Sequence, residues 1–246
     1  MVAASSSYHK VRYDLALMLM DAGAILTSAS DHPLVVTRKK GLHGREKGFK
    51  LKLHEKNPDA PLSPIFLNFR TSDNPKPGPL TPKLIDIAAR CMRSIEFEGR
   101  LQFDAVVGIP RAGEPFAKLL GKFSGKPCLT LNKCENGGKR KIASLRADVP
   151  PSVRKVLVVD DLITKADSKR EAIEVLRSEG MVVTDIVVLV DREQGGRKGL
   201  LEAGCTLHSV FGITEMLDML VGAGKMKSKL RKKIHTYLVR EYVESQ

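Results

Sequence analysis

The chain has 246 residues, of which 42% are hydrophobic, and its formal net charge is +13 at pH 7. This length and composition fit a soluble protein with one core plus extensions, without independent domains. No apolar stretch approaches the roughly 20 residues of a membrane span, and residues 1–10 lack a signal-peptide apolar region. Four scattered cysteines argue against a disulfide framework or structural zinc. We therefore expect a cytoplasmic protein.

The first part of the chain predicts two helices separated by irregular segments. Residues 8–22 carry Val11, Leu15, Met18, Leu19 and Ala22 at helical spacing, which predicts an amphipathic helix. The Gly, Lys and Arg-rich stretch 38–48 is typical of a loop or hairpin. Several prolines between residues 75 and 82 mark a break, and residues 84–95 then read as a second helix.

The segment FDAVVGIPRAGEPFA, residues 103–117, predicts a strand followed by a turn and a helix. Gly108 and Gly113 would let the backbone approach a diphosphate closely, and Arg111 would add a fixed charge there. Glycine and proline are also common in ordinary turns. This segment alone therefore favours the ordinary interpretation.

The run VLVVDDLITKADS, residues 156–168, is the most informative part of the sequence. Its first four residues are typical of a parallel strand covered on both faces. Asp160 and Asp161 follow, at the end of the strand where ligands bind in open α/β sheets, and could accept hydrogen bonds from ribose hydroxyls. The turn from Thr164 to Ser168 opens a helix whose free amides could hold a phosphate. The alternative is that the two acids merely end a strand.

The second half of the chain continues as a βαβ unit. Residues 168–179 predict a helix and residues 186–190 another strand, which indicates an α/β fold. Residues 206–210 predict a further strand, in which His208 is better explained as a core or edge residue than as a catalytic one.

These segments resemble type I phosphoribosyltransferases. The run around the two acids is similar to the family's motif for 5-phosphoribosyl 1-pyrophosphate (PRPP), and residues 189–220 resemble the closing segment of orotate phosphoribosyltransferases, including the form fused in UMP synthase. The resemblance covers roughly residues 47–220. It implies a mainly parallel sheet flanked by helices, with a small hood subdomain. We accordingly expect residues 1–224 to form a single phosphoribosyltransferase domain with N-terminal hood elements.

The resemblance also implies roles for particular residues. Asp160 and Asp161 would hold the ribose hydroxyls and count as catalytic, while the pyrophosphate would face a loop with Gly108, Arg111 and Gly113. The base would lie against Lys52, Phe66 and Arg192. An ordinary surface salt bridge is the alternative role of Arg192. The 5-phosphate would be bound by the turn residues Thr164, Lys165, Ala166, Asp167 and Ser168.

Two segments depart from the family pattern. The family has a small residue and then glycine after the threonine, whereas this chain has Lys165 and Ala166, followed by Asp167. Alanine would be strained there only if the backbone needs a positive φ. Lys165 could add a cation for the phosphate. We expect Asp167 to face solvent or to cap the helix.

The second departure is the catalytic loop, which in the family supplies a lysine to the diphosphate. Residues 131–150 fit that pattern only with a gap, and Cys134, Glu135 and Gly138 are among the aligned positions. The sequence alone does not assign the catalytic residue, and a solvated basic loop is the alternative. The candidates are Lys133, Lys139, Arg140 and Lys141.

The activity that the resemblance implies is transfer of the 5-phosphoribosyl group from PRPP to orotate, by a homodimer, with Mg²⁺ carried by PRPP rather than by assigned protein ligands. Positive charge gathers at residues 38–56, 133–155 and after 224, and two of these regions flank the expected site of anionic substrates. A phosphoribosyltransferase for another nucleobase stays open. So does a catalytically weak PRPP-binding regulator or RNA-binding protein on the same fold.

Residues 225–246 are expected to form a basic, amphipathic C-terminal extension. An apolar row of Leu230, Ile234, Leu238 and Tyr242 indicates a helix. Packing of this helix on the body or on a second subunit is favoured over contact with RNA.

Overall fold

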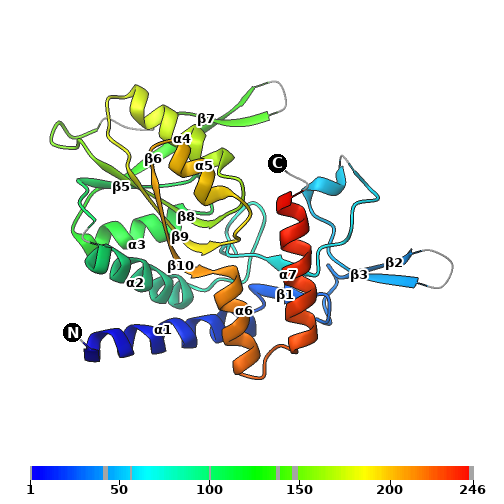
Figure 1. Cartoon of the computed structure of the whole chain (residues 1–246). Coiled ribbons are helices and arrows are strands. Elements are labelled where there is room, and N and C mark those ends of the chain that lie inside the picture. The colour runs from blue at the N-terminus through cyan, green and yellow to red at the C-terminus, as the bar shows by residue number, and fades with distance from the viewer. Residues whose placement is uncertain are drawn as a thin grey trace.

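The computed structural model describes residues 2–40, 44–55, 57–99, 101–136, 139–145 and 149–243. Its centre is a six-stranded sheet in the order β10-β9-β8-β5-β6-β7 (Figure 1). The first five strands in this order are parallel, and β7 runs antiparallel to β6 at one edge. The strands are β5 (Ala105–Gly108), β6 (Cys128–Asn136), β7 (Lys139–Leu145), β8 (Val156–Ile163), β9 (Asp185–Asp191) and β10 (Thr206–Gly212).

Helices cover both faces of this sheet because the strands are apolar on both sides. Along β8, Leu157 and Val159 pack into one hydrophobic cluster, whereas Val156 and Val158 pack into another. The expected α/β fold, a mainly parallel sheet flanked by helices, is therefore confirmed. Helices α1 (Val2–Asp21), α2 (Pro82–Gly99), α3 (Glu114–Ser124) and α6 (Ile213–Gly222) share the first cluster, while α4 (Asp167–Ser178) and α5 (Gly196–Glu202) share the second.

A smaller group of elements, here called the hood, lies beside the carboxyl ends of the strands (Figure 1). It contains β1 (Ile25–Thr27) paired with β4 (Ile65–Leu67), the hairpin of β2 (Val36–Lys40) and β3 (Gly44–Gly48), and the short helix η1 (Lys52–Glu55). The C-terminal helix α7 (Ser228–Val243) runs between the hood and the sheet domain (Figure 1). Its side chains Ile234, Tyr237 and Leu238 are buried in the main core.

Most predicted elements are confirmed, with local corrections. The helix expected at 8–22 lies within α1, but Val11 is 39% exposed and does not belong to its buried face. The described residues of the stretch 38–48, which are 38–40 and 44–48, contribute to the β2–β3 hairpin. The segment expected as a catalytic loop, 131–150, is instead largely the hairpin of β6 and β7, because its two halves pair in antiparallel register. In the described part of the chain, no helix is long and apolar enough to cross a membrane.

Candidate active site

A pocket of about 480 Å³ lies at the carboxyl ends of β5 and β8. The sheet contributes Asp160 and Asp161 to its wall, and the loop after β5 contributes Arg111. The turn after β8 adds Thr164 and Ser168. The other charged side chains of the wall, all basic, are Lys52, Arg70, Lys76, Lys133 and Lys169. The pocket therefore joins an acidic pair to a ring of cations.

The two aspartates lie inside β8, which continues to Ile163 rather than ending before them. Both are buried, and Asp160 forms an ion pair with the buried Lys169 from the first turn of α4. The Lys169 ammonium also donates to the carbonyl oxygen of Leu162 at 2.6 Å. Burial, and then the neighbouring charge of Asp160, raise the pKa of Asp161 well above its usual value. Asp160 is thus neutralised by an internal cation, whereas Asp161 lines the pocket and has no ion-pair partner among the described residues.

The loop after β5 needs glycine at two positions. A Cβ at Gly108 would lie 2.6 Å from the Glu114 backbone, and one at Gly113 would lie 2.3 Å from the carbonyl oxygen of Val159. This tight packing brings the loop and β8 together, as the sequence indicated. Arg111 adopts a φ of 77° and lines the pocket, a strained conformation of the kind often found at ligand sites.

The turn between β8 and α4 lies at the edge of the pocket. Ala166 precedes α4 with a φ of 72°, so the backbone does take the left-handed conformation in which alanine is strained. Within the described residues, no side chain caps the start of α4. Asp167 is exposed, which confirms the solvent-facing alternative and not the capping one. Thr164 and Ser168 line the pocket beside the helix terminus, an arrangement suited to a phosphate.

The β6–β7 hairpin brings one of the candidate lysines to the pocket. Lys133 lines the pocket wall, close to the bulge between Asn132 and Lys133. Lys141 pairs with Cys134, so strand alternation places Lys141 on the opposite face of the hairpin from Lys133. The side chains of Lys139, Arg140 and Glu135 lie outside the described residues, as does Gly138.

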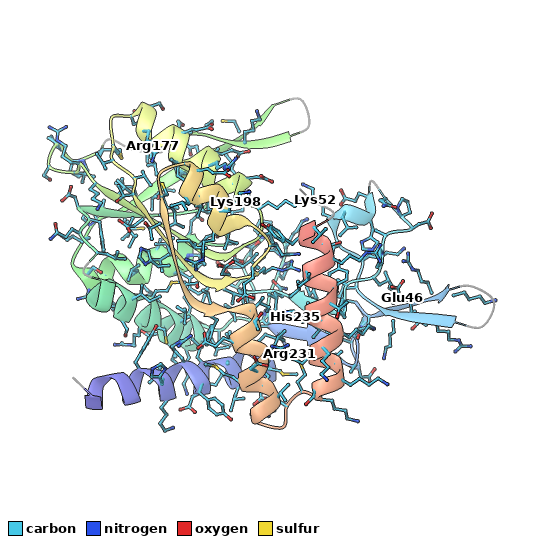
Figure 2. All side chains as sticks on the ribbon, viewed as in Figure 1. Glu46, Lys52, Arg177, Lys198, Arg231 and His235 are labelled. Atoms are coloured by element: carbon cyan, nitrogen blue, oxygen red, sulfur yellow. The ribbon has the colours of Figure 1, made fainter. Side chains whose placement is uncertain are left out.

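A second pocket of about 410 Å³ adjoins the first and shares Lys52 and Thr164 with it. Its walls include Arg192, which follows β9, and Glu241 from α7. Figure 2 shows Lys52 near the C-terminal end of α7. Phe66 is not part of either wall; it stacks on Phe49 with ring centroids 5.6 Å apart. Of the three residues expected around the base, the structure thus brings Lys52 and Arg192 together.

A backbone hydrogen bond fixes the position of Arg192. Its amide donates to the carbonyl oxygen of Ile163 at 3.0 Å, which ties it to the end of β8. The buried Asp191 carboxylate accepts the amide of Glu193 at 2.8 Å and stabilises the same turn. Burial lowers the pKa of the Arg192 guanidinium, while Tyr237 and Glu241 act in the opposite direction. Arg192 forms no ion pair within the described part of the chain, so the surface salt bridge considered from sequence is not present.

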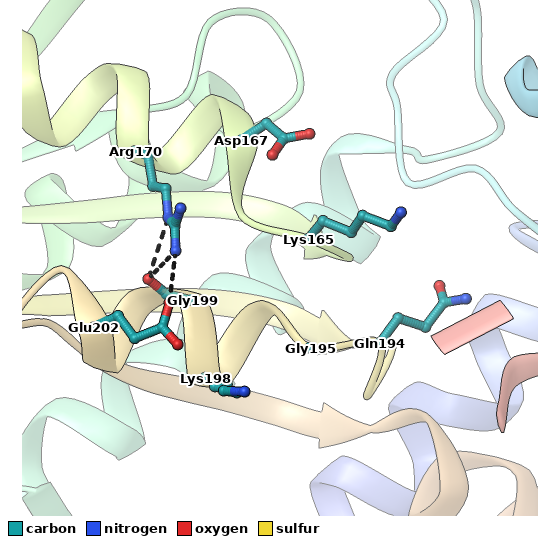
Figure 3. Close-up of a pocket in the computed structure, with 8 residues that line it drawn as sticks. All are labelled: Lys165, Asp167, Arg170, Gln194, Gly195, Lys198, Gly199 and Glu202. Carbon is teal, nitrogen blue, oxygen red and sulfur yellow. Dashed lines mark hydrogen bonds and ion pairs between the residues drawn. The ribbon is translucent and has the colours of Figure 1, made fainter. Parts of the chain in front are cut away.

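A third pocket, of about 240 Å³, continues from the second along the turn before α5 (Figure 3). Arg170 forms an ion pair with Glu202 at 3.2 Å and donates to the carbonyl oxygen of Gly199 at 2.9 Å. Lys165 and Gln194 extend together toward the side shared with the second pocket (Figure 3). Lys165 therefore lies at the phosphate turn but outside the first pocket.

Several residues of the site were not expected from the sequence. Lys169 lies in the α4 pattern as one of several polar residues, and only its contact with Asp160 distinguishes it. Lys76 comes from the proline-rich segment, for which only a break was predicted, and Arg70 precedes that segment. Glu241 belongs to the C-terminal helix, for which packing was the expected role.

Asp160 and Asp161 also suit a Mg²⁺ ion that binds together with the phosphate groups of a ligand. Among the described residues, no group of three or more His, Cys, Asp or Glu side chains is placed to hold a metal ion. Mg²⁺ is commonly bound through one or two carboxylates together with substrate phosphates. Asp160 and Asp161 beside the phosphate turn fit that pattern.

Comparisons with known proteins agree with this geometry. A family model described as the phosphoribosyl transferase domain matches residues 80–200. An orotate phosphoribosyltransferase of Sulfurisphaera tokodaii is 37% identical over 148 residues, which are 60% of this chain and 74% of that protein. Another, from Sulfolobus acidocaldarius, is 32% identical over 184 residues, covering 75% of this chain and 88% of that protein. The structure of Leishmania donovani UMP synthase matches 93% of this chain and 42% of that chain with a TM-score of 0.68 at 23% identity, which shows a common fold.

Proposed function

Because the chain belongs to the orotate phosphoribosyltransferase family, we propose that it transfers the 5-phosphoribosyl group of PRPP to orotate. The products are orotidine 5′-monophosphate and pyrophosphate, as in pyrimidine nucleotide biosynthesis. The observation that carries this proposal is the position of Asp160 and Asp161 in one pocket, between the Gly108–Gly113 loop and the phosphate turn.

Each part of the site has a task in this reaction. Asp160 and Asp161 accept hydrogen bonds from the ribose hydroxyls, while the turn from Thr164 to Ser168 holds the 5-phosphate. Arg111 and Lys133 face the diphosphate and stabilise the charge that develops on it as it leaves. The protein acts mainly by alignment and electrostatics, since the reacting groups belong to the two substrates.

The base occupies the second pocket in this proposal. Lys52 and Arg192 supply cations there, and the planar guanidinium of Arg192 suits a carboxylate or a pair of carbonyl groups. Orotate carries both kinds of group on one ring. This pocket is therefore a better match to an acidic pyrimidine than to a neutral base.

The proposal includes a metal ion, a compartment and an assembly state. Mg²⁺ bound by PRPP would neutralise charge on the diphosphate. All four cysteines are free thiols, which supports a reducing compartment such as the cytoplasm. A homodimer is expected from the family resemblance, and light scattering after gel filtration measures it.

The test of function is pyrophosphate release from PRPP with Mg²⁺, comparing orotate with uracil, adenine, guanine and hypoxanthine. We expect release with orotate only, and none from an Asp160→Asn/Asp161→Asn double variant. Release with another base instead would keep the chemistry and reassign the base pocket. PRPP binding without release for any base would favour a regulator on the same fold, especially with RNA binding that responds to PRPP.

A further inference from the structure

The C-terminal helix contributes a carboxylate to the proposed base pocket. Ile234, Tyr237 and Leu238 form the buried face of α7, and Glu241 lies one turn beyond Tyr237 on the same face. The core-facing stripe of α7 thus ends at the wall of the 410 Å³ pocket. Glu241 is half-buried there and shares the pocket wall with the cations Lys52 and Arg192.

Two buried polar atoms near this carboxylate have no hydrogen-bond partner among the described residues. They are the Nε of Arg192 and the hydroxyl of Tyr237. Tyr237 lies near Ser63 and Glu241 without a hydrogen bond of normal geometry to either, and burial, followed by the charge of Glu241, raises its pKa to about 12. Glu241 is also near enough to Arg192 to influence its pKa, but no ion pair within 4 Å joins the two side chains.

A cation and a carboxylate that share a half-buried pocket without pairing are unfavourable unless another polar group satisfies them. A ligand that fits between them needs acceptor atoms for Arg192 and a donor for Glu241. A pyrimidine with a carboxylate, ring carbonyls and a ring N–H offers both on one plane. An anionic ligand without such a donor would meet only repulsion from Glu241.

We propose that Glu241 is a specificity-determining residue for the base, and that its carboxylate accepts a hydrogen bond from a ring N–H while Arg192 binds the acceptor groups of the same ring. The inference rests on the proposed function. It adds that α7 completes the base pocket and selects pyrimidines that keep this N–H.

The test compares orotate with its N3-methyl derivative, which lacks one ring donor. Calorimetry with Mg²⁺ and pyrophosphate present measures the two dissociation constants without turnover. We expect the unmodified protein to bind orotate about 10- to 100-fold more tightly than the methylated base, the range for a hydrogen bond to a charged group. In Glu241→Ala this preference should fall to within about threefold, mainly through weaker orotate binding.

Two further variants separate the acceptor from other effects. Glu241→Gln keeps an acceptor oxygen and should retain much of the preference, whereas a role of the negative charge alone would be lost equally in Gln and Ala. Glu174→Ala removes an exposed carboxylate on α4 and should leave both constants unchanged. Thermal melts check that each variant is folded.

If Glu241→Ala keeps the same preference for orotate over the methylated base, the inference is overturned. Tighter orotate binding by Glu241→Ala would also overturn it, because Glu241 would then only repel the orotate anion. Absence of orotate binding by the unmodified protein would overturn it as well. The proposed function is judged separately by pyrophosphate release. Normal turnover of orotate by the unmodified protein, together with an unchanged preference in Glu241→Ala, would contradict the role of Glu241 and support the proposed function.

Discussion

At the scale of single residues, Asp160 and Asp161 differ in what surrounds them. Asp160 neutralises the buried Lys169, whereas Asp161 is buried beside a like charge. The raised pKa of Asp161 means that the folded protein binds more protons than the unfolded chain between the usual aspartate pKa, about 4, and the raised value. Stability from this group therefore falls as pH rises through that interval.

The two single variants should move stability in opposite directions. Asp161→Asn removes a destabilising charge and should raise the free energy of unfolding at pH 7 by about 1 kcal/mol, with the gain shrinking near pH 4. Asp160→Asn leaves Lys169 buried without its partner and should lower the free energy of unfolding by about 3 kcal/mol. Urea unfolding at both pH values measures these changes. Equal shifts in the two variants would contradict the different environments described here, and both should lose turnover.

Arg192 permits a second prediction at this scale. Arg192→Ala should raise KM for orotate on the order of 10- to 100-fold, because a charged hydrogen-bond donor is lost, and should leave KM for PRPP unchanged. Steady-state kinetics with each substrate varied in turn provides the measurement. Arg154→Ala, an exposed arginine away from the described pockets, is the matched control. An unchanged KM for orotate would show that Arg192 is not a polar contact of the base.

At the scale of elements, the β6–β7 hairpin decides which lysine reaches the pocket. Lys133 and Lys141 lie on opposite faces of the hairpin, although both were candidates from sequence. Removing one preorganised electrostatic group commonly lowers kcat about 100-fold or more. We expect that loss for Lys133→Ala in pyrophosphate release, and a change under about threefold for Lys141→Ala. A larger loss for Lys141→Ala than for Lys133→Ala would place the catalytic face of the hairpin on the other side.

The turn between β8 and α4 shows how an element tolerates a sequence departure. Ala166 occupies a left-handed conformation that glycine would adopt without strain, and Gly108 and Gly113 keep the opposite loop close to β8. The backbone path of the phosphate turn is thus formed despite the missing glycine. Strain at this position is offset by the packed strand and helix on either side.

At the scale of the whole molecule, α7 is continuous with the main core. A domain of residues 1–224 with an extension of 225–246 stays a prediction of chain organisation, but three α7 side chains are buried with those of the sheet domain. At roughly 2 kcal/mol each, their burial is comparable with the total stability of a domain, about 5–15 kcal/mol.

Deletion of residues 225–246 should therefore lower the melting temperature by more than about 10 °C or prevent folding. Circular dichroism melts of the full and shortened chains measure the difference. Lys232→Ala changes an exposed residue of the same helix and should have no effect beyond about 1 °C. If the shortened chain has nearly the same melting temperature as the full chain, α7 is dispensable for stability. Orotate binding by the shortened chain would then measure the contribution of α7 to the base pocket.

The sequence by itself determined the features that depend on neighbouring residues. The apolar run before Asp160, the turn to Ser168 and the helical pattern after it are local, so they identified β8, α4 and the position of the acids toward the carboxyl end of β8. Gly108 and Gly113 likewise indicated a close backbone approach. The structure keeps these patterns because the spacing of apolar residues along a strand or helix is set by the backbone geometry of that element alone.

Only the tertiary structure decided which distant side chains meet. The contact of Lys169 with Asp160, the separation of Phe66 from the pocket walls and the arrival of Glu241 beside Arg192 depend on how packed elements are oriented. Strand pairing also separated Lys133 from Lys141. Periodicity shows which face of an element is apolar, but it does not show which other element covers that face, because that choice depends on packing between segments far apart in the chain.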